Sequence, residues 1–189
     1  MIGYAMCGSF CTLSQSLKQL EALVKEGYDI LPIMSFNVYT QNTRFFEAEA
    51  LKKRVELICG KECVHTIQDA EPLGPKTPLE TLVISPCTGN TLAKLSLAIT
   101  DSPVLMAAKA HLRNERPVVI FVSTNDGLSM NFKNIGNLLN CKNIYFVPFT
   151  QDNYKLKPNS LVAETSLILE TLEAALDGKQ LQPIIRNPK

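Results

Sequence analysis

Residues 81–101 read Thr-Leu-Val-Ile-Ser-Pro-Cys-Thr-Gly-Asn-Thr-Leu-Ala-Lys-Leu-Ser-Leu-Ala-Ile-Thr-Asp, and this stretch decides the fold. The apolar run 82–84 predicts a strand that stops at Pro86, and apolar residues at helical spacing from Thr91 onward predict a helix. Open α/β sheets bind ligands beyond the carboxyl ends of their strands, where helix N-termini offer free N–H groups. The loop 86–91 is therefore the first candidate site.

The same alternation of strand and helix continues on both sides of this stretch. Further strands are predicted at 2–6, 29–34, 118–122 and 144–147, with a short one at 64–67, and 144–147 is expected to be the last. Further helices are predicted after residue 12 and at 43–59, 103–114, 131–140 and 161–177. This order predicts a three-layer α/β fold with a mainly parallel sheet.

Length and composition favour one globular domain. The chain has 189 residues, of which 46% are hydrophobic and 20% charged, and we expect a single α/β domain over 1–180. Residues 181–189 form a tail with Pro183 and Pro188, a candidate arm or subunit contact. Lys plus Arg number 19 against 18 Asp plus Glu, without a basic block, so we expect neither nucleic acid nor a membrane surface as partner.

The six cysteines are interpreted as reduced thiols of a cytoplasmic protein, because the chain starts directly with a strand pattern and is of ordinary size. Cys7 with Cys11, and Cys59 with Cys63, are spaced four apart, but without convergent histidines these spacings are weak evidence for zinc, so no metal is expected. No apolar run reaches the roughly 20 residues of a membrane span.

Four polar loops follow predicted strands, at 7–12, 35–37, 86–91 and 123–127. They offer hydroxyls, amides and helix N–H groups, which suit a ligand with a phosphate and a hydrogen-bonding heterocycle. In loop 7–12, Gly8 allows close backbone approach and the hydroxyls of Ser9 and Thr12 can donate, although a plain turn with an N-cap is the alternative. The fingerprint Gly-x-Gly-x-x-Gly of a conventional NAD site is absent.

Reactive groups are scarce in these loops. No Gly-x-Ser-x-Gly elbow and no paired carboxylates of a hydrolase are present, and Asp126 is the one acid. A cofactor is therefore expected to carry the chemistry.

Residues 86–91, Pro-Cys-Thr-Gly-Asn-Thr, resemble the Pro-Ala-Ser-Ala-Asn-Thr motif of the flavoprotein family that includes flavin-dependent cysteine decarboxylases and flavin prenyltransferases. Leu92-Ala93-Lys94, Thr100-Asp101 and the turn Gly8-Ser9 extend the likeness. One branch, the B subunits of dipicolinate synthases from spore-forming bacteria, is similar over nearly the whole chain. The segments that carry this closer resemblance are 35–38, 42–45, 70–76, 100–109, 123–126 and 157–163.

The resemblance implies a Rossmann-like or flavodoxin-like fold that binds FMN. It also implies a partnership with a nicotinamide-binding A subunit, which holds NAD(P), in making dipicolinic acid from a dihydrodipicolinate precursor in the cytoplasm of the mother cell of a sporulating bacterium. Relatives commonly build the cofactor site across a trimer interface, so we expect a homo-oligomer in which loop 150–160 reaches a neighbour. The cofactor-binding residues implied are Gly8, Ser9, Thr12, Ser35, Asn37, Thr88, Asn90, Thr91 and Ser123.

Two departures from the family narrow the reaction. Ser123 and its neighbours stand where prenyltransferases have an arginine, and Val64-His65-Thr66-Ile67 matches the His-Ile pair of the decarboxylases in position only. We therefore favour oxidation of a small dicarboxylate over prenyl transfer or decarboxylation.

The roles of individual side chains stay open. Arg44, Lys76 and Lys155 are candidate carboxylate binders, with solvated surface charge as the alternative. The proton acceptor is His65, Asp126 or water. The competing functions are a non-catalytic subunit that stabilises its partner and keeps a vestigial phosphate site, and a flavin-dependent decarboxylase.

Overall fold

The strands of the protein form one seven-stranded sheet in the computed structural model, which describes residues 1–74, 76–77 and 79–187. They span Ile2–Met6 (β1), Ile30–Met34 (β2), Leu82–Cys87 (β3), Val118–Thr124 (β4), Ile144–Phe146 (β5), Phe149–Thr150 (β6) and Leu161–Ala163 (β7). Pro188 of the predicted tail lies outside the described residues.

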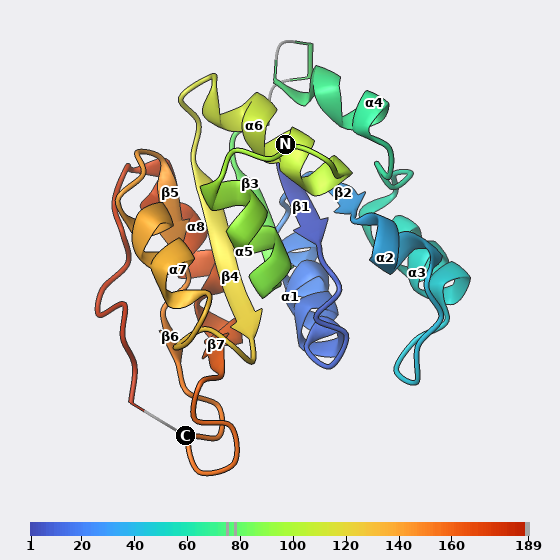
Figure 1. Ribbon diagram of the computed structural model, residues 1–189. Coiled ribbons are helices and arrows are strands. Elements are labelled where there is room, and N and C mark those ends of the chain that lie inside the picture. The colour runs from blue at the N-terminus through green and yellow to red at the C-terminus, as the bar shows by residue number, and fades with distance from the viewer. Residues whose placement is uncertain (75, 78, 188–189) are drawn as a thin grey trace.

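The helices cover both faces of this sheet (Figure 1). They span Leu13–Lys25 (α1), Phe36–Thr40 (α2), Ala48–Cys59 (α3), Ile67–Ala70 (α4), Gly89–Ser96 (α5), Pro103–Leu112 (α6), Phe132–Leu139 (α7) and Ile168–Leu176 (α8), with 3₁₀ turns at Glu71–Leu73 (η1) and Thr165–Leu167 (η2). α5, α6 and α7 lie on one face and α1 and α8 on the other, which gives three layers.

The strand order is β2-β1-β3-β4-β7-β6, and β5 pairs with β4. β1 to β5 run parallel, whereas β7 is antiparallel to β4 and β6. The order β2-β1-β3-β4-β5 is that of a flavodoxin-like fold, so the predicted fold class is confirmed. No helix in the described part of the chain is long and apolar enough to cross a membrane.

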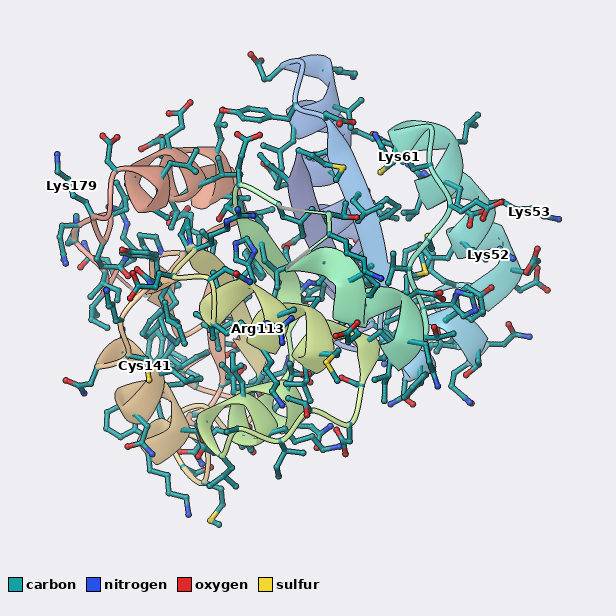
Figure 2. All side chains as sticks on the ribbon, turned by 90° about the horizontal axis from the view of Figure 1, so that it is seen from above. Lys52, Lys53, Lys61, Arg113, Cys141 and Lys179 are labelled. Carbon is teal, nitrogen blue, oxygen red and sulfur yellow. The ribbon has the colours of Figure 1, made fainter. Side chains whose placement is uncertain are left out.

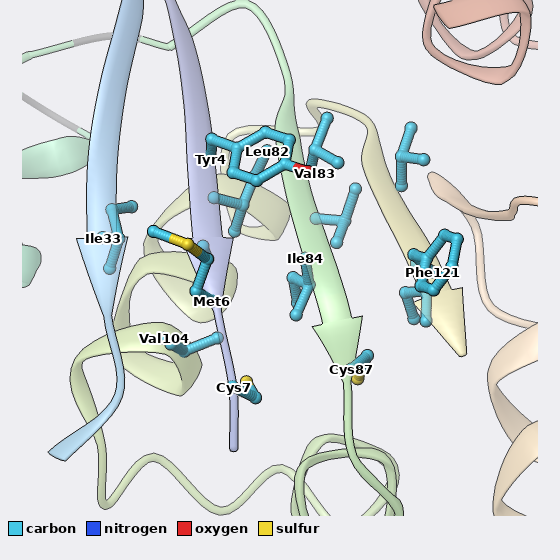
Figure 3. Packing of buried hydrophobic residues seen from close by; sticks show 14 of the residues in the cluster. Tyr4, Met6, Cys7, Ile33, Leu82, Val83, Ile84, Cys87, Val104 and Phe121 are labelled. Atoms are coloured by element: carbon cyan, nitrogen blue, oxygen red, sulfur yellow. The ribbon is translucent and has the colours of Figure 1, made fainter. Parts of the chain in front are cut away.

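The central strands are buried on both faces. Every residue of β1 and β3 is buried, because apolar runs such as Leu82, Val83 and Ile84 in β3 place side chains against both helical layers (Figure 3). α1 turns Leu13, Leu17 and Leu20 toward the sheet at helical spacing. Burial on both faces explains why these strands appear in the sequence as unbroken apolar stretches.

The strand predicted to stop at Pro86 continues to Cys87, which corrects the first prediction. The pairing of β3 with β4 shifts register between Ile84 and Cys87, and such an irregularity accommodates a proline within a strand. Only Thr88 then separates β3 from α5, so the expected loop 86–91 is mostly strand end and first helical turn.

The predictions for the C-terminal third are wrong in two places. Residues 144–147 do not contain the last strand, because β6 and β7 follow, and residues 161–163 of the predicted helix form β7. Leu161 and Ala163 are buried on one side, the period-two pattern of a strand, but three residues are too few to stand out from the helical pattern of α8.

Several helices are shorter than predicted, and the reason is visible for α3 and α5. α3 begins at Ala48, because the Thr43 hydroxyl accepts hydrogen bonds from the N–H groups of Phe45 and Phe46 and holds a turn there. α5 ends at Ser96, two residues before Ala98 adopts a positive φ of 57°. The short strand predicted at 64–67 is a single bridge between Ile33 and Val64.

Candidate functional site

A cleft of about 310 Å³ opens at the carboxyl ends of β1 and β3. The chain continues from β1 to one side of the sheet and from β3 to the other, and such a reversal leaves a crevice in open α/β sheets. Cys7 and Cys87 mark these strand ends (Figure 3). The lining residues are Cys7, Gly8, Ser35, Phe36, Asn37, Thr88, Asn90, Thr91, Lys94, Asp101, Ser102 and Leu105. Six of the nine cofactor-binding residues expected from the sequence are among them.

The other three expected residues form a hydroxyl cluster, defined as Ser9, Thr12 and Ser123, of which Ser9 directly follows Gly8. Ser123 Oγ lies 2.8 Å from Ser9 Oγ and 2.7 Å from Thr12 Oγ1, and the latter two oxygens are 3.3 Å apart. Thr12 is the N-cap of α1, so the cluster sits where the helix dipole favours an anion. β4 thus places Ser123 beside Ser9 and Thr12, which precede it in the chain by more than a hundred positions.

The first turn of α5 supplies the opposite end of the same polar surface. Thr88 caps the helix by accepting a hydrogen bond from the Thr91 N–H at 3.2 Å, and the two threonine hydroxyls are 3.0 Å apart. Thr91 Oγ1 also donates to Cys7 Sγ at 3.3 Å. Burial raises the pKa of the Cys7 thiol to about 11, so it is neutral near pH 7.

Ser35 follows β2 and lines the cleft, and its side-chain oxygen has an unsatisfied hydrogen-bonding capacity. Its Oγ is buried and has no hydrogen-bond partner among the described residues. Buried hydroxyls in native proteins are nearly always paired. A bound ligand with a polar group at this wall would satisfy it.

The charged groups of the lining were missed by sequence reasoning. Lys94 Nζ and Asp101 Oδ2 form an ion pair of 2.6 Å, and they are the charged side chains of the cleft within the described residues. Lys94 stands three positions after Thr91 in α5, which places both on one helix face, a signal that could have identified it. Asp101, Ser102 and Leu105 come from the start of α6, which only the tertiary packing brings close.

The two catalytic candidates lie outside the lining. His65 stacks on Tyr39 with ring centroids 3.9 Å apart, and its Nδ1 is 3.2 Å from the carbonyl oxygen of Cys63. Asp126 accepts hydrogen bonds on both carboxylate oxygens, from Thr124 Oγ1 at 2.5 Å and from Asn131 Nδ2 at 2.7 Å. Neither side chain faces the cleft within the described chain.

The three candidate carboxylate binders are exposed and lie in loops. The guanidinium of Arg44 lies 4.8 Å from the centre of the Phe45 ring, and Lys155 Nζ lies 6.0 Å from that of Tyr154. None of these, nor Lys76, lines the cleft of the described chain. Their substrate role stays a prediction.

Other basic side chains are spread around the periphery. Figure 2 shows Lys52, Lys53 and Lys61 at the outer edge near α3, far from Lys179. The described residues include no group of three or more His, Cys, Asp or Glu side chains placed to hold a metal ion.

Comparison with known proteins assigns the family. The chain matches the family described as Flavoprotein over residues 2–166 and belongs to it, which confirms the resemblance seen in residues 86–91. It is 50% identical over 184 residues to the B subunit of dipicolinate synthase from Bacillus subtilis (strain 168), covering 97% of this chain and 92% of that protein.

Solved structures agree with this assignment. The crystal structure of the B subunit of dipicolinate synthase from Bacillus halodurans is 47% identical, covers 100% of this chain and 96% of its own, and superposes with a TM-score of 0.91. The FMN-dependent cysteine decarboxylase SpaF shares the fold at 20% identity, with a TM-score of 0.65 over 94% of this chain and 95% of its own.

Proposed function

We propose that this chain is the FMN-binding subunit of a dipicolinate synthase. It acts with a nicotinamide-binding A subunit, which holds NAD(P), to oxidise a dihydrodipicolinate precursor to dipicolinate in the cytoplasm of the mother cell during sporulation. The single observation that carries this proposal is the 50% identity to the B subunit of dipicolinate synthase, which extends over 97% of the chain. The matched length includes the segments of the cleft as well as those of the core.

The residues of the cleft fit FMN. The hydroxyl cluster beside Gly8, at the N-terminus of α1, offers uncharged donors to a phosphate. The unpaired Ser35 Oγ and the amide of Asn37 on the β2 side suit ribityl or phosphate oxygens. FMN, when bound, would supply the electron-accepting ring that the protein's own side chains lack.

The substrate would be a dianion, and the chain offers few cations to it. Lys94 in the cleft is already paired with Asp101. We propose that Arg44, Lys76 and Lys155 supply charge from loops around the cleft or around that of a neighbouring subunit in a homo-oligomer.

The test is reconstitution. Oxidation of dihydrodipicolinate is measured with the A subunit alone, with this chain alone and with both, each with and without FMN. We expect the full rate only with both chains and FMN, and we expect the purified chain to show flavin absorption at about 450 nm. An A subunit whose rate is unchanged when this chain is omitted would refute the proposal.

A second candidate function is a non-catalytic subunit that stabilises its partner. The observation that favours it is the state of the two candidate proton acceptors, since Asp126 uses both oxygens internally and His65 is stacked on Tyr39. This candidate predicts that the A subunit is active alone, and that adding this chain, without FMN, raises only its melting temperature.

A further inference from the structure

Behind the cleft, five side chains form a continuous hydrogen-bonded row, here named the Asp126 network. Thr124 Oγ1 donates to Asp126 Oδ1 at 2.5 Å, and Asn131 Nδ2 donates to Asp126 Oδ2 at 2.7 Å. Asn134 Nδ2 then donates to Asn131 Oδ1 at 2.8 Å, and Ser96 Oγ donates to Asn134 Oδ1 at 2.9 Å. Asn131 and Asn134 are buried, at 6% and 7% exposure, whereas Ser96, Thr124 and Asp126 are half-buried. Such a mutually satisfied network, with a buried centre, fixes the elements that contribute to it.

The network holds α5 at both ends. Ser96 is the last residue of α5, and Gly89 is the first. A Cβ atom at Gly89 would lie 2.5 Å from Asn131 Nδ2, 2.6 Å from Thr124 Oγ1 and 2.7 Å from Asp126 Oδ1. The backbone of the first turn therefore rests directly on the network, and only glycine permits this approach.

The same network holds the end of β4. Thr124 is the last residue of β4 and follows Ser123, which bonds to the rest of the hydroxyl cluster. The first turn of α5 carries Thr88, Asn90 and Thr91 into the cleft. One set of side chains thus sets the distance between the two parts of the polar surface.

We infer that Asp126 is a positioning residue and not the proton acceptor of the reaction. The two hydrogen bonds of its side chain hold the first turn of α5 against the end of β4, and so set the spacing between Thr91 and Ser123 that the ligand meets; an amide at position 126 can make both bonds. A general base must lie within reach of the substrate, whereas Asp126 does not line the cleft and both of its carboxylate oxygens are oriented by hydrogen bonds inside the chain. The inference rests on the proposed function in one respect, namely that the ligand of the cleft is FMN.

An exchange of side chains separates the two roles. The variant N131D places a second carboxylate against that of Asp126 and breaks the network through like charge. The double variant D126N/N131D restores it, because the amide at position 126 then donates to the carboxylate at position 131, which still accepts from Asn134. The double variant also removes the negative charge from position 126, so it retains positioning and abolishes any proton acceptor there.

Two measurements are made on these variants and on D126N. The first is the dissociation constant for FMN, from flavin fluorescence. We expect N131D to weaken FMN binding roughly tenfold or more, and D126N and D126N/N131D to stay within about threefold of the wild type. The second is hydrogen exchange of residues 85–97, which is measured without FMN. N131D should accelerate exchange in this segment, and D126N/N131D should restore protection.

Thr171→Val is the matched control. Thr171 is buried in α8, and its hydroxyl donates to the Leu167 carbonyl oxygen at 2.6 Å, so its loss destabilises the protein without touching α5. Its FMN affinity and exchange in 85–97 should match the wild type. If N131D fails to fold, a folded D126N/N131D variant that binds FMN is itself the rescue.

Three outcomes would overturn the inference. They are unchanged exchange in folded N131D, equal losses in Thr171→Val, or a double variant no better than N131D. Activity of the reconstituted synthase that is lost in both D126N and D126N/N131D, with FMN affinity retained, would restore Asp126 as the base.

A wild-type chain that does not bind FMN would refute the proposed function alone, because the hydrogen-exchange pattern, which is measured without FMN, decides the positioning role.

Discussion

The two walls of the cleft differ in how far their polar groups are paired within the chain. On the side of β1 and α5, the Thr91 hydroxyl bonds to Thr88 and Cys7, and in the adjoining hydroxyl cluster Thr12 bonds to Ser123. On the wall made by β2, the buried Ser35 Oγ has no partner among the described residues. The polar groups of the first side are thus satisfied in the folded chain itself, whereas we expect Ser35 on the second side to be satisfied by a ligand. Changes on the first should therefore appear in stability, and changes on the second in affinity.

The largest expected effect belongs to Cys7, at the base of the paired wall. Its thiol has a pKa of about 11 in the folded protein against 9.0 in the unfolded reference, so the unfolded chain releases this proton at lower pH. The free energy of unfolding should therefore fall between pH 9 and pH 11, by about 2–3 kcal/mol for this group. Urea denaturation of the wild type and of Cys7→Ala is carried out at several pH values. The contribution of Cys7 is the difference between the two proteins in how steeply the free energy of unfolding falls with pH.

That difference isolates Cys7 from the other buried groups whose pKa is raised, Tyr4 among them, because these titrate in both proteins. Parallel pH profiles for the two proteins would contradict the prediction. Parallel profiles would mean that water reaches Cys7 and solvates its thiolate in the folded protein.

Ser123→Ala tests the hydroxyl cluster. The change leaves the hydroxyls of Ser9 and Thr12 without their shared partner, and Thr12 is 6% exposed, so we expect a loss of about 1–3 kcal/mol in the free energy of unfolding. Urea denaturation measures it without ligand. Ser14→Ala, at an exposed position of α1, is the control and should stay near the wild type. Equal stability of both variants would show that the paired wall contributes nothing to folding.

Ser35→Ala should behave in the opposite manner. Removal of an unpaired buried hydroxyl is expected to change the ligand-free free energy of unfolding by less than about 0.5 kcal/mol. FMN affinity should fall roughly tenfold, because the ligand loses a hydrogen bond that only it satisfies. Calorimetric titration with FMN measures the second effect. A stability loss as large as that of Ser123→Ala would remove the distinction between the walls.

Local signals in the sequence predicted much of the fold. The apolar runs of β1 and β4 are long enough to identify strands, Gly60 ends α3 with a positive φ of 64°, and Ser102 caps α6 just before Pro103. These features depend on residues close together in the chain, which is why a single sequence reveals them.

What the sequence did not reveal depends on distant contacts. β6 and β7 contain two and three residues and exist because β7 pairs with β4. The presence of Asp101 in the cleft wall depends on where α6 packs. Ser35 was predicted as a site residue, but its lack of a partner follows from the packing around it. The family motif identified the cofactor-binding loops and said nothing of the Asp126 network.

The position of β7 near the end of the chain determines when, during synthesis, the cofactor site can be completed. Every residue that lines the cleft comes from the first 105 of the chain, yet Ser123 and Thr124 pair with Val162 and Leu161, and Ser160 Oγ donates to the Thr124 carbonyl oxygen. A nascent chain whose residues 160–163 are still inside the ribosome lacks the strand that pairs with the end of β4 and holds Ser123 of the hydroxyl cluster. We therefore expect the cofactor to be acquired only after nearly the whole chain has been synthesised.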